Sequence, residues 1–215
     1  MKKLLIILGG VAELSFLKEY YDKMQPDMVI AADGALEAAK KADIPCDVAM
    51  GDFDTVSQEL LEQCMREKKV KLITFPPEKD ETDAQLTLQY AIDQKPDMIR
   101  ILGALGGRAD HMLANLELLK LPLKAGIDCE IVDRQNRIRL LDGEYTIKKS
   151  DSWKYVSFVS YTEKTEGLIL EGFKYPLDNF TLKKGSPRCI SNEITSDMAR
   201  ISFDSGMLYC ICSRD

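Results

Sequence analysis

The sequence contains a single histidine, His111, and none of its six cysteines forms a Cys-x-x-Cys pair. Zinc sites are usually built from such closely spaced Cys and His ligands, so a Cys/His zinc site is poorly supported. The two common glycine-rich nucleotide fingerprints, G-x-G-x-x-G and G-x-x-x-x-G-K-[ST], are also missing. We interpret the cysteines as reduced, buried thiols, so candidate ligand groups lie among other residue types.

Positive charge is scarce, with 29 Lys and Arg against 35 Asp and Glu and a net charge of −6. A general nucleic-acid surface needs an excess of Lys and Arg, so we expect no nucleic-acid partner. ATP remains compatible with this balance, because divalent cations bridge carboxylates and phosphates. No apolar run reaches the roughly 18 residues of a membrane span, and the run at residues 4–8 is too short for a signal peptide. We expect a cytoplasmic protein with no membrane partner.

In the first half of the chain, apolar runs alternate with segments of helical periodicity. The runs expected to form strands are residues 4–8, 28–32, 48–50, 70–75, 99–102 and 128–132. This alternation predicts an α/β fold with a parallel, Rossmann-like sheet. Acidic and glycine-rich segments follow several of these runs. Because ligands bind beyond the carboxyl ends of strands in open parallel sheets, we expect the polar loops to gather at one edge.

The second half changes character at about residue 136, where short runs rich in Ile, Tyr, Val, Thr and Phe begin. Residues 155–159 alternate in the way of a strand with one buried face. Asp142-Gly143 predicts a hairpin turn between the two runs that flank it. We predict an α/β domain over residues 1–133, followed by an antiparallel β-sandwich domain over residues 134–215.

The sharpest local feature is residues 51–54, which carry two carboxylates two positions apart. In extended chain such side chains point the same way, with Cα atoms about 6–7 Å apart. Asp52 and Asp54 would repel each other without a cation between them, which favours an Mg²⁺ site. The alternative is a pair of helix caps ahead of the helical segment that follows Ser57.

A second acidic segment contains Lys79, Asp80, Thr82 and Asp83. Thr82 and Asp83 can act as ordinary caps at a helix start. In the alternative interpretation, Asp83 faces a cation in the same crevice and Lys79 supplies a counter-charge for phosphate. This segment alone does not decide between the two.

A third segment, residues 103–111, contains three glycines that let backbone N–H groups approach an anion closely. The helix start that follows adds partial positive charge, and Arg108 can pair with phosphate oxygens in bidentate fashion. His111 could be a helix-start residue without a role, but its position beside Arg108 and Asp110 favours function. Asn115 follows it by four residues, on the same helical face.

Asp33 ends another expected strand, where an Asp-Gly pair alone would indicate only a turn. Together, four polar loops at one sheet edge supply several carboxylates, one Arg, one His and glycine-rich backbone. That inventory favours electrostatic catalysis of phosphoryl transfer assisted by Mg²⁺. No Ser-His-Asp set and no nucleophile are indicated.

In order and spacing, these segments resemble the thiamin pyrophosphokinase family. The matching residues are 32–35, 51–54, 79–83, 106–115, 185–186 and 191–193. The resemblance implies a homodimer with shared active sites, whose chains combine an α/β ATP-binding domain with a thiamin-binding β-sandwich. The family moves the β,γ-diphosphate of ATP onto the primary hydroxyl of thiamin, which yields thiamin diphosphate and AMP.

The same resemblance implies roles for individual residues. Asp52, Asp54 and Asp83 are expected to be the catalytic acids that bind Mg²⁺. Ser191 and Asn192 are expected to form part of the thiamin pocket, across the dimer interface. The residues expected to hold ATP and its phosphates are Asp33, Lys79, Asp80, Thr82, Arg108, Asp110, His111 and Asn115.

Two other functions stay open at this point. A metal-dependent phosphoesterase also uses paired aspartates, although it usually needs more metal-binding histidines than this chain has. A non-catalytic nucleotide or vitamin sensor would bind ATP without turnover. Release of AMP from ATP in the presence of thiamin separates these alternatives from the kinase.

Overall fold

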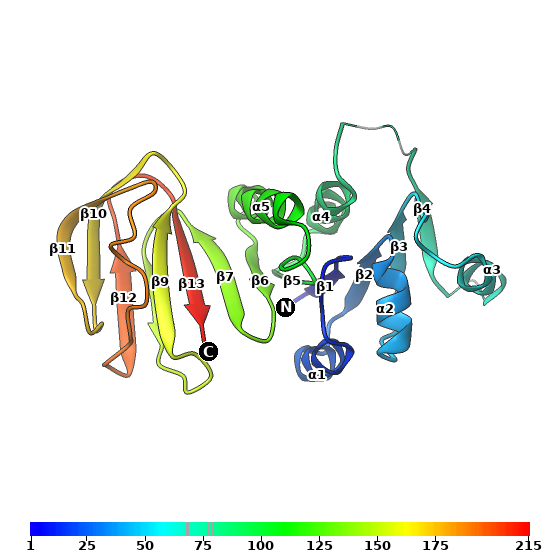
Figure 1. Cartoon of the computed structure of the whole chain (residues 1–215), viewed down its shortest axis with the longest axis horizontal. Coiled ribbons are helices and arrows are strands. Elements are labelled where there is room, and N and C mark those ends of the chain that lie inside the picture. The colour runs from blue at the N-terminus through cyan, green and yellow to red at the C-terminus, as the bar shows by residue number, and fades with distance from the viewer. Residues whose placement is uncertain (68, 77, 79) are drawn as a thin grey trace. The chain divides into compact units, whose positions relative to one another are not determined.

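The computed structural model describes residues 1–67, 69–76, 78 and 80–215. The chain divides into two units, Met1–Arg134 and Gln135–Asp215, and each unit has its own hydrophobic core. Figure 1 labels the helices and strands of both. Over the described ranges, every helix is too short or too polar to cross a membrane.

The first unit is an α/β structure whose strands are parallel and pair in the order β4-β3-β2-β1-β5-β6. Its strands are β1 Lys3–Ile7, β2 Met28–Ala32, β3 Val48–Gly51, β4 Lys71–Thr74, β5 Met98–Leu102 and β6 Asp128–Val132. Its helices are α1 Leu14–Met24, α2 Ala35–Lys41, α3 Gln58–Glu67, α4 Asp83–Asp93, α5 Ala109–Leu118 and α6 Lys120–Lys124. The six predicted strands and the α/β class are confirmed.

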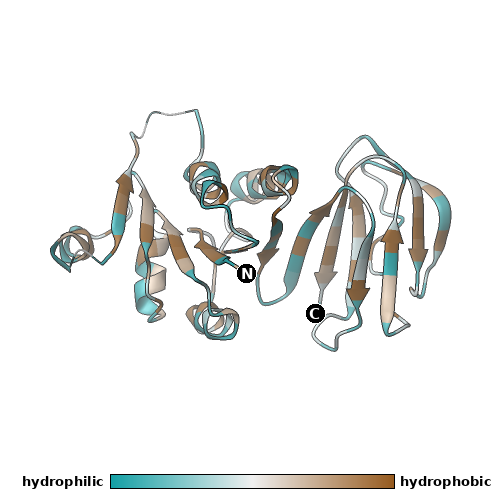
Figure 2. Ribbon diagram, turned by 180° about the vertical axis from the view of Figure 1, so that it is seen from behind, coloured by the Kyte–Doolittle hydropathy of each residue, from teal (hydrophilic) through white to brown (hydrophobic). Residues whose placement is uncertain are grey.

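Helices cover both faces of this sheet, which explains why its strands are almost continuously apolar. On one face, Leu5 and Ile7 pack with Leu17 of α1 and with apolar residues of α2 and α3. On the other face, Ile6 lies beside Leu88 of α4 and near the residues of α5. Figure 2 shows the result, with largely hydrophobic strands and helices that carry both hydrophobic and hydrophilic residues.

The strand order reverses direction at β1. From β1 the chain builds outward through β2, β3 and β4, and it then returns to add β5 on the opposite side of β1. The loops that follow β1 and β5 therefore leave neighbouring strand ends and start side by side, joined by the hydrogen bond from the Leu8 N–H to the carbonyl of Leu102. Such a reversal opens a crevice at the carboxyl edge of the sheet, where open α/β folds bind their ligands.

The second unit is a β-sandwich made of two antiparallel sheets, with strand orders β7-β13-β9 and β11-β10-β12-β8. Its strands are β7 Asn136–Leu141, β8 Tyr145–Lys148, β9 Tyr155–Ser160, β10 Lys164–Glu171, β11 Leu177–Lys183, β12 Met198–Ser202 and β13 Leu208–Ser213. Both sheets contribute to one core, in which the rings of Phe158 and Phe173 meet edge to face at 5.5 Å. The predicted sandwich is confirmed.

The hairpin predicted at Asp142-Gly143 is wrong. Strand β7, which precedes the turn, pairs with β13, whereas β8, which follows it, pairs with β12 of the other sheet. The turn thus crosses between the sheets of the sandwich. Gly143 is also not among the described glycines with positive φ, a backbone conformation that the tight type I′ hairpin turn requires.

Candidate active site

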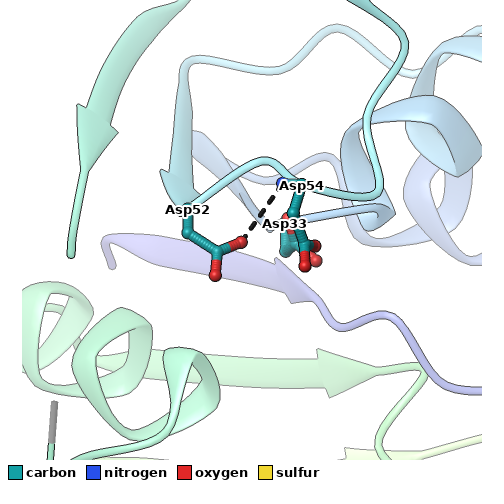
Figure 3. Close-up of side chains that lie close together, drawn as sticks. All are labelled: Asp33, Asp52 and Asp54. Atoms are coloured by element: carbon teal, nitrogen blue, oxygen red, sulfur yellow. Dashed lines mark hydrogen bonds between the residues drawn. The ribbon is translucent and has the colours of Figure 1, made fainter. Parts of the chain in front are cut away.

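Three aspartates gather at the carboxyl edge of the sheet. Asp33 directly follows β2, and Asp52 and Asp54 directly follow β3. Because β2 and β3 are parallel neighbours, their carboxyl ends lie side by side. One carboxylate oxygen of each residue lies within 4.8 Å of the others, and Figure 3 shows the three side chains together. We call these three residues the aspartate cluster.

The backbone around the aspartate cluster is tightly turned. Asp33 and Phe53 both adopt the left-handed conformation, with φ of 48° and 60°. The Phe53 ring is buried in the core of the unit, so Asp52 and Asp54 on either side of it remain outside. A Cβ atom on Gly51 would lie 3.0 Å from the Cβ atom of Asp33, so a glycine at this position permits the close approach of the two loops.

The charges of the aspartate cluster are poorly compensated. The neighbouring carboxylate of Asp52 raises the pKa of Asp54, and burial and Asp33 add to the effect. Asp33 Oδ2 accepts a hydrogen bond of 2.7 Å from the Thr55 hydroxyl. Its other oxygen, Oδ1, is buried and has no hydrogen-bond partner among the described residues. Several carboxylate oxygens with unused lone pairs are the donor set that divalent cations such as Mg²⁺ prefer.

A cavity of about 610 Å³ opens next to the aspartate cluster and shares Asp33 with it. Its walls come from the loops after β1 and β5 and from the first turns of α4 and α5. Its volume falls within the range of small-molecule sites. The predicted site residues that line it are Asp33, Thr82, Asp83, Arg108, His111 and Asn115.

Two glycine-containing loops meet at the floor of this cavity. The Gly10 N–H donates a hydrogen bond of 2.9 Å to the carbonyl of Gly103. A Cβ atom on Gly10 would lie 2.3 Å from that carbonyl oxygen, and one on Gly103 would lie 2.2 Å from the carbonyl oxygen of Leu8. Only glycine fits at these two contacts. The glycine pair Gly9-Gly10, directly after the first strand, is the signal in the sequence that could have indicated this contact.

Arg108 is held by a carboxylate two residues away. Its Nε and Nη2 atoms donate to the two oxygens of Asp110 at 3.1 and 2.6 Å. The guanidinium lowers the pKa of Asp110 to about 2, helped by a hydrogen bond from the His111 N–H. Because Arg108 and Asp110 are both exposed, the pair can present guanidinium N–H groups toward an anion in the cavity.

Asn115 and Thr82 contact protein groups at the cavity wall. The Asn115 Nδ2 atom donates a hydrogen bond of 2.9 Å to the carbonyl of Ala104, which ties α5 to the loop after β5. Thr82 accepts a hydrogen bond of 3.2 Å from the Gln85 N–H and caps α4, so its capping interpretation is confirmed. Asp80 is exposed and is not among the described residues of the cluster or of the cavity wall. Lys79 lies outside the described residues.

Comparisons with known proteins cover both units. The family model described as "Thiamin pyrophosphokinase, catalytic domain" matches residues 20–131. The family model described as "Thiamin pyrophosphokinase, vitamin B1 binding domain" matches residues 144–208. The thiamine pyrophosphokinase of Bacillus subtilis is 38% identical over 219 residues, with 100% of both chains covered. The chain belongs to the thiamin pyrophosphokinase family.

Solved structures agree with this family assignment. The crystal structure of the Bacillus subtilis thiamine pyrophosphokinase superposes with a TM-score of 0.90 at 33% identity, covering 100% of both chains. That of the Geobacillus thermodenitrificans thiamin pyrophosphokinase gives a TM-score of 0.86 at 32% identity, covering 99% of this chain and 98% of the other. The phosphoesterase and sensor alternatives receive no support from these relatives.

Ser191 and Asn192 lie within the segment that matches the vitamin B1 binding domain of the family. Ser191 is exposed, and its backbone is left-handed with φ of 57°. Asn192 is only 3% exposed. The two neighbouring side chains therefore differ in their exposure to solvent, although the family resemblance implies the same role for both.

Proposed function

We propose that this protein transfers the β,γ-diphosphate group of ATP to the primary hydroxyl of thiamin, with thiamin diphosphate and AMP as products. Family membership over the whole chain supports the reaction and both substrates. The observation that carries the proposal is the aspartate cluster beside the 610 Å³ cavity at the strand-order reversal. A site that combines acidic cation ligands, an arginine and glycine-rich backbone suits a triphosphate.

The proposal includes Mg²⁺ held by the aspartate cluster, Asp33, Asp52 and Asp54. Asp33 Oδ1, which has no hydrogen-bond partner among the residues that the structure describes, fits this ion, and so does the raised pKa of Asp54. Both observations indicate negative charge without compensation. When bound, the ion would neutralise part of the triphosphate charge. Asp83, which the resemblance assigns to the metal, lines the adjoining cavity, and we propose it as a further acid near the phosphates.

The remaining residues of the cavity orient the nucleotide. Arg108 donates N–H groups to phosphate oxygens, and the backbone of the two glycine-containing loops approaches the same anion. Asn115 keeps one of these loops in position through its bond to Ala104. His111 lines the same wall. Transfer of a phosphoryl group to an alcohol depends mainly on in-line alignment and charge stabilisation, so this positioning is the principal task of the protein.

We further propose that residues 1–133 bind ATP and Mg²⁺ and that residues 134–215 bind thiamin and form a homodimer with shared active sites. The match of the second segment to a vitamin B1 binding domain supports this division. The cytoplasmic location also stays a prediction. Light scattering coupled to size-exclusion chromatography tests the dimer, and a monomeric mass would contradict it.

AMP release from ATP in the presence of Mg²⁺ and thiamin tests the reaction. We expect stoichiometric AMP and thiamin diphosphate, with AMP formation dependent on thiamin and strongly reduced in Asp52→Asn. A phosphoesterase would hydrolyse its substrate without thiamin, and a sensor would bind ATP with no turnover. Either result from the purified full-length protein would refute the proposal.

A further inference from the structure

The loop after β3, residues 52–57, is attached to the start of α2 at two points. Asp33, two residues ahead of α2, accepts through Oδ2 a hydrogen bond of 2.7 Å from the Thr55 hydroxyl. Four residues further on, Glu37 Oε1 accepts a hydrogen bond of 2.9 Å from the Ser57 N–H. Both attachments come directly after the two acidic residues of the loop, so they hold that end of the loop against α2.

Two apolar residues of the same loop lie in the core of the first unit. Phe53 and Val56 are each 8% exposed and pack in that core, whereas Asp54 and Thr55 between them are exposed. Apolar contacts hold the loop against the unit but do not orient its polar groups, because they have no preferred direction. Hydrogen bonds are directional, so the bonds to Thr55 and Ser57 determine how the loop faces α2.

Glu37 is suited to hold the loop because its carboxylate has a partner on each oxygen. Oε2 pairs with Lys41 Nζ at 3.2 Å, one turn further along α2. The hydrogen bond from the Ser57 N–H, followed by the contact with Lys41, lowers the pKa of Glu37, so the group stays ionised. The carbonyl of Ser57 accepts a hydrogen bond from the Leu61 N–H, which places Ser57 at the start of α3. A carboxylate is favourable at such a helix start.

Gly34 leaves room for the Thr55 hydroxyl. A Cβ atom at position 34 would lie 2.9 Å from Thr55 Oγ1, so the hydroxyl would have to move. The φ of Gly34 is −54°, which any residue adopts, and the nearby hydroxyl rather than the backbone therefore favours glycine. In its present position the hydroxyl occupies Asp33 Oδ2. Asp33 Oδ1, buried and without a hydrogen-bond partner in the described part of the chain, is left for a cation.

We propose that Thr55 and Glu37 are positioning residues for the cation, which hold the loop of Asp52 and Asp54 against Asp33 before the ion binds. This inference rests on the proposed function, and specifically on Mg²⁺ held by the aspartate cluster. Like charges repel, so a loop without these two attachments separates the carboxylates. The cation then has to order the loop as it binds, and this cost lowers its affinity.

Titration of the full-length protein with free Mg²⁺ tests the proposal through two readouts. One is the rate of AMP formation, and the other is the rise in melting temperature without substrates. In both, we expect the half-maximal Mg²⁺ concentration to increase about five- to tenfold in Thr55→Val and about two- to fivefold in Glu37→Ala, with the KM for thiamin unchanged. Thr55→Ser and Glu37→Gln keep a hydrogen-bonding oxygen and should stay within about twofold of the wild type.

Gly34→Ala tests the role of the Thr55 hydroxyl without removing any polar group. Its Cβ should displace the hydroxyl from Asp33 and raise the half-maximal Mg²⁺ concentration about as much as Thr55→Val does. When residue 55 is already alanine, through Thr55→Ala, the same glycine substitution should add nothing, because no hydroxyl remains to be displaced. An equal effect of Gly34→Ala in both backgrounds would contradict the role of the hydroxyl.

Two matched controls in the sandwich separate positioning from loss of stability. Thr162→Val removes a hydroxyl that bonds to Lys164 and Met207, and Glu166→Ala removes a carboxylate that pairs with Lys164 at 2.7 Å. Both controls should lower the melting temperature without Mg²⁺ and leave the half-maximal Mg²⁺ concentration unchanged. If Thr55→Val does not fold, Gly34→Ala carries the same test.

A Mg²⁺ dependence like that of the two controls in Thr55→Val and Glu37→Ala would overturn the inference. In that case a wild-type protein that forms AMP with thiamin and responds to Mg²⁺ would leave the proposed function standing. A wild-type protein that never forms AMP when thiamin and Mg²⁺ are supplied, and whose melting temperature does not respond to Mg²⁺, would remove the proposed function and this inference together.

Discussion

The aspartate cluster of the first unit and the Ser191–Asn192 turn of the second unit are both irregular segments with left-handed residues. They differ in how their polar groups are satisfied. In the aspartate cluster, like charges face one another and Asp33 Oδ1 has no hydrogen-bond partner in the described part of the chain. In the turn, the side chain of Asn192 makes three hydrogen bonds to backbone groups.

In the aspartate cluster, the charges are balanced only when a ligand binds. In the turn, the Asn192 side chain already has its hydrogen-bond partners without a ligand. Carboxylates that repel one another reduce the stability of the fold, and this repulsion is offset when a cation binds between them. A buried amide with its bonds made contributes to stability whether or not a ligand is present. Substitutions in the aspartate cluster should therefore lower activity without lowering stability, whereas substitutions under the turn should affect both.

The largest expected effect comes from Asp54→Asn. The loss of one cation-binding charge should lower kcat for AMP formation by about 10²–10³-fold, comparable to removal of one group that stabilises a developing charge. The melting temperature in the absence of Mg²⁺ should stay constant or rise, because the repulsion from Asp52 is relieved. Asp178→Asn, an exposed aspartate of β11, serves as the control and should change neither quantity. A large fall in melting temperature for Asp54→Asn would contradict the expectation that substitutions in the aspartate cluster leave stability unchanged.

The next largest effect concerns the adjacent glycines of the loop after β1. Gly10→Ala should lower the free energy of unfolding by about 1–3 kcal/mol and weaken ATP binding, because its Cβ would press on the carbonyl oxygen of Gly103. Gly9→Ala is its matched control for stability alone, since no heavy atom lies within 4 Å of a Cβ at that position but Gly9 lines the same cavity. Chemical denaturation measures the change in stability of both variants, and the KM for ATP is compared between Gly10→Ala and the wild type. An equal free energy of unfolding for the two variants would mean that the loops do not need this close contact.

Arg108→Lys tests whether the two-pronged guanidinium group of Arg108, which pairs with Asp110, is needed for ATP. Lysine keeps the positive charge but cannot reproduce the two-pronged contact with a carboxylate or phosphate, so we expect kcat/KM for ATP to fall about tenfold. Arg200→Lys breaks an equivalent pair with Glu144, at 2.8 and 3.0 Å, in the sandwich. That control should leave kinetics unchanged. If both variants lose the same activity, the loss in Arg108→Lys cannot be attributed to a contact between Arg108 and ATP in the cavity.

The smallest effect is a pH dependence of stability with opposite signs at two aspartates. Asp54 has a raised pKa, so its folded form retains the proton longer, and the free energy of unfolding without Mg²⁺ should fall as pH rises from 3.8 through that raised pKa. Asp110 has a pKa of about 2, so the stability it contributes is present above 3.8 and is lost as pH falls toward 2.

Denaturation curves of Asp54→Asn and Asp110→Asn across this pH range resolve the two contributions. Subtraction of each variant from the wild type should leave slopes of opposite sign. Saturating Mg²⁺ should suppress only the slope that belongs to Asp54, because the proposed cation competes with its proton. The same sign at both residues would contradict the assignment of repulsion to one and pairing to the other.

Much of the fold was predictable because apolar runs report burial directly. Strands β1, β2 and β3 follow from uninterrupted apolar runs, since helices cover both faces of the sheet. Strands β4, β5 and β6 each contain a charged residue, namely Lys71, Arg100 and Glu130, and were predicted from the apolar residues around it. Strands β11 and β12 had weaker patterns and were not predicted. The Asp142-Gly143 turn was misread because its residues suit a hairpin, while the pairing of β7 with β13 depends on strands far away in the sequence.

The candidate site was predictable in its residue types and in the edge of the sheet where they lie, but not in which carboxylates lie within reach of one cation. Asp33 joins Asp52 and Asp54 because β2 and β3 are neighbours, a pairing that no local pattern in residues 33–54 specifies. The contact between Gly10 and Gly103 likewise depends on β5 lying next to β1. For Ser191 and Asn192, the family resemblance indicated the segment. Their residue types did not show that Ser191 is exposed and Asn192 is buried.

By itself the sequence determined which segments are strands, which loops carry charge and which family the motifs resemble, because these properties depend on near neighbours in the chain. Only the tertiary structure decided which carboxylates converge, which glycines touch, and that Asn192 faces inward while Ser191 faces solvent. Those outcomes depend on strand order and on contacts between residues far apart in sequence, for which hydrophobic periodicity carries no information.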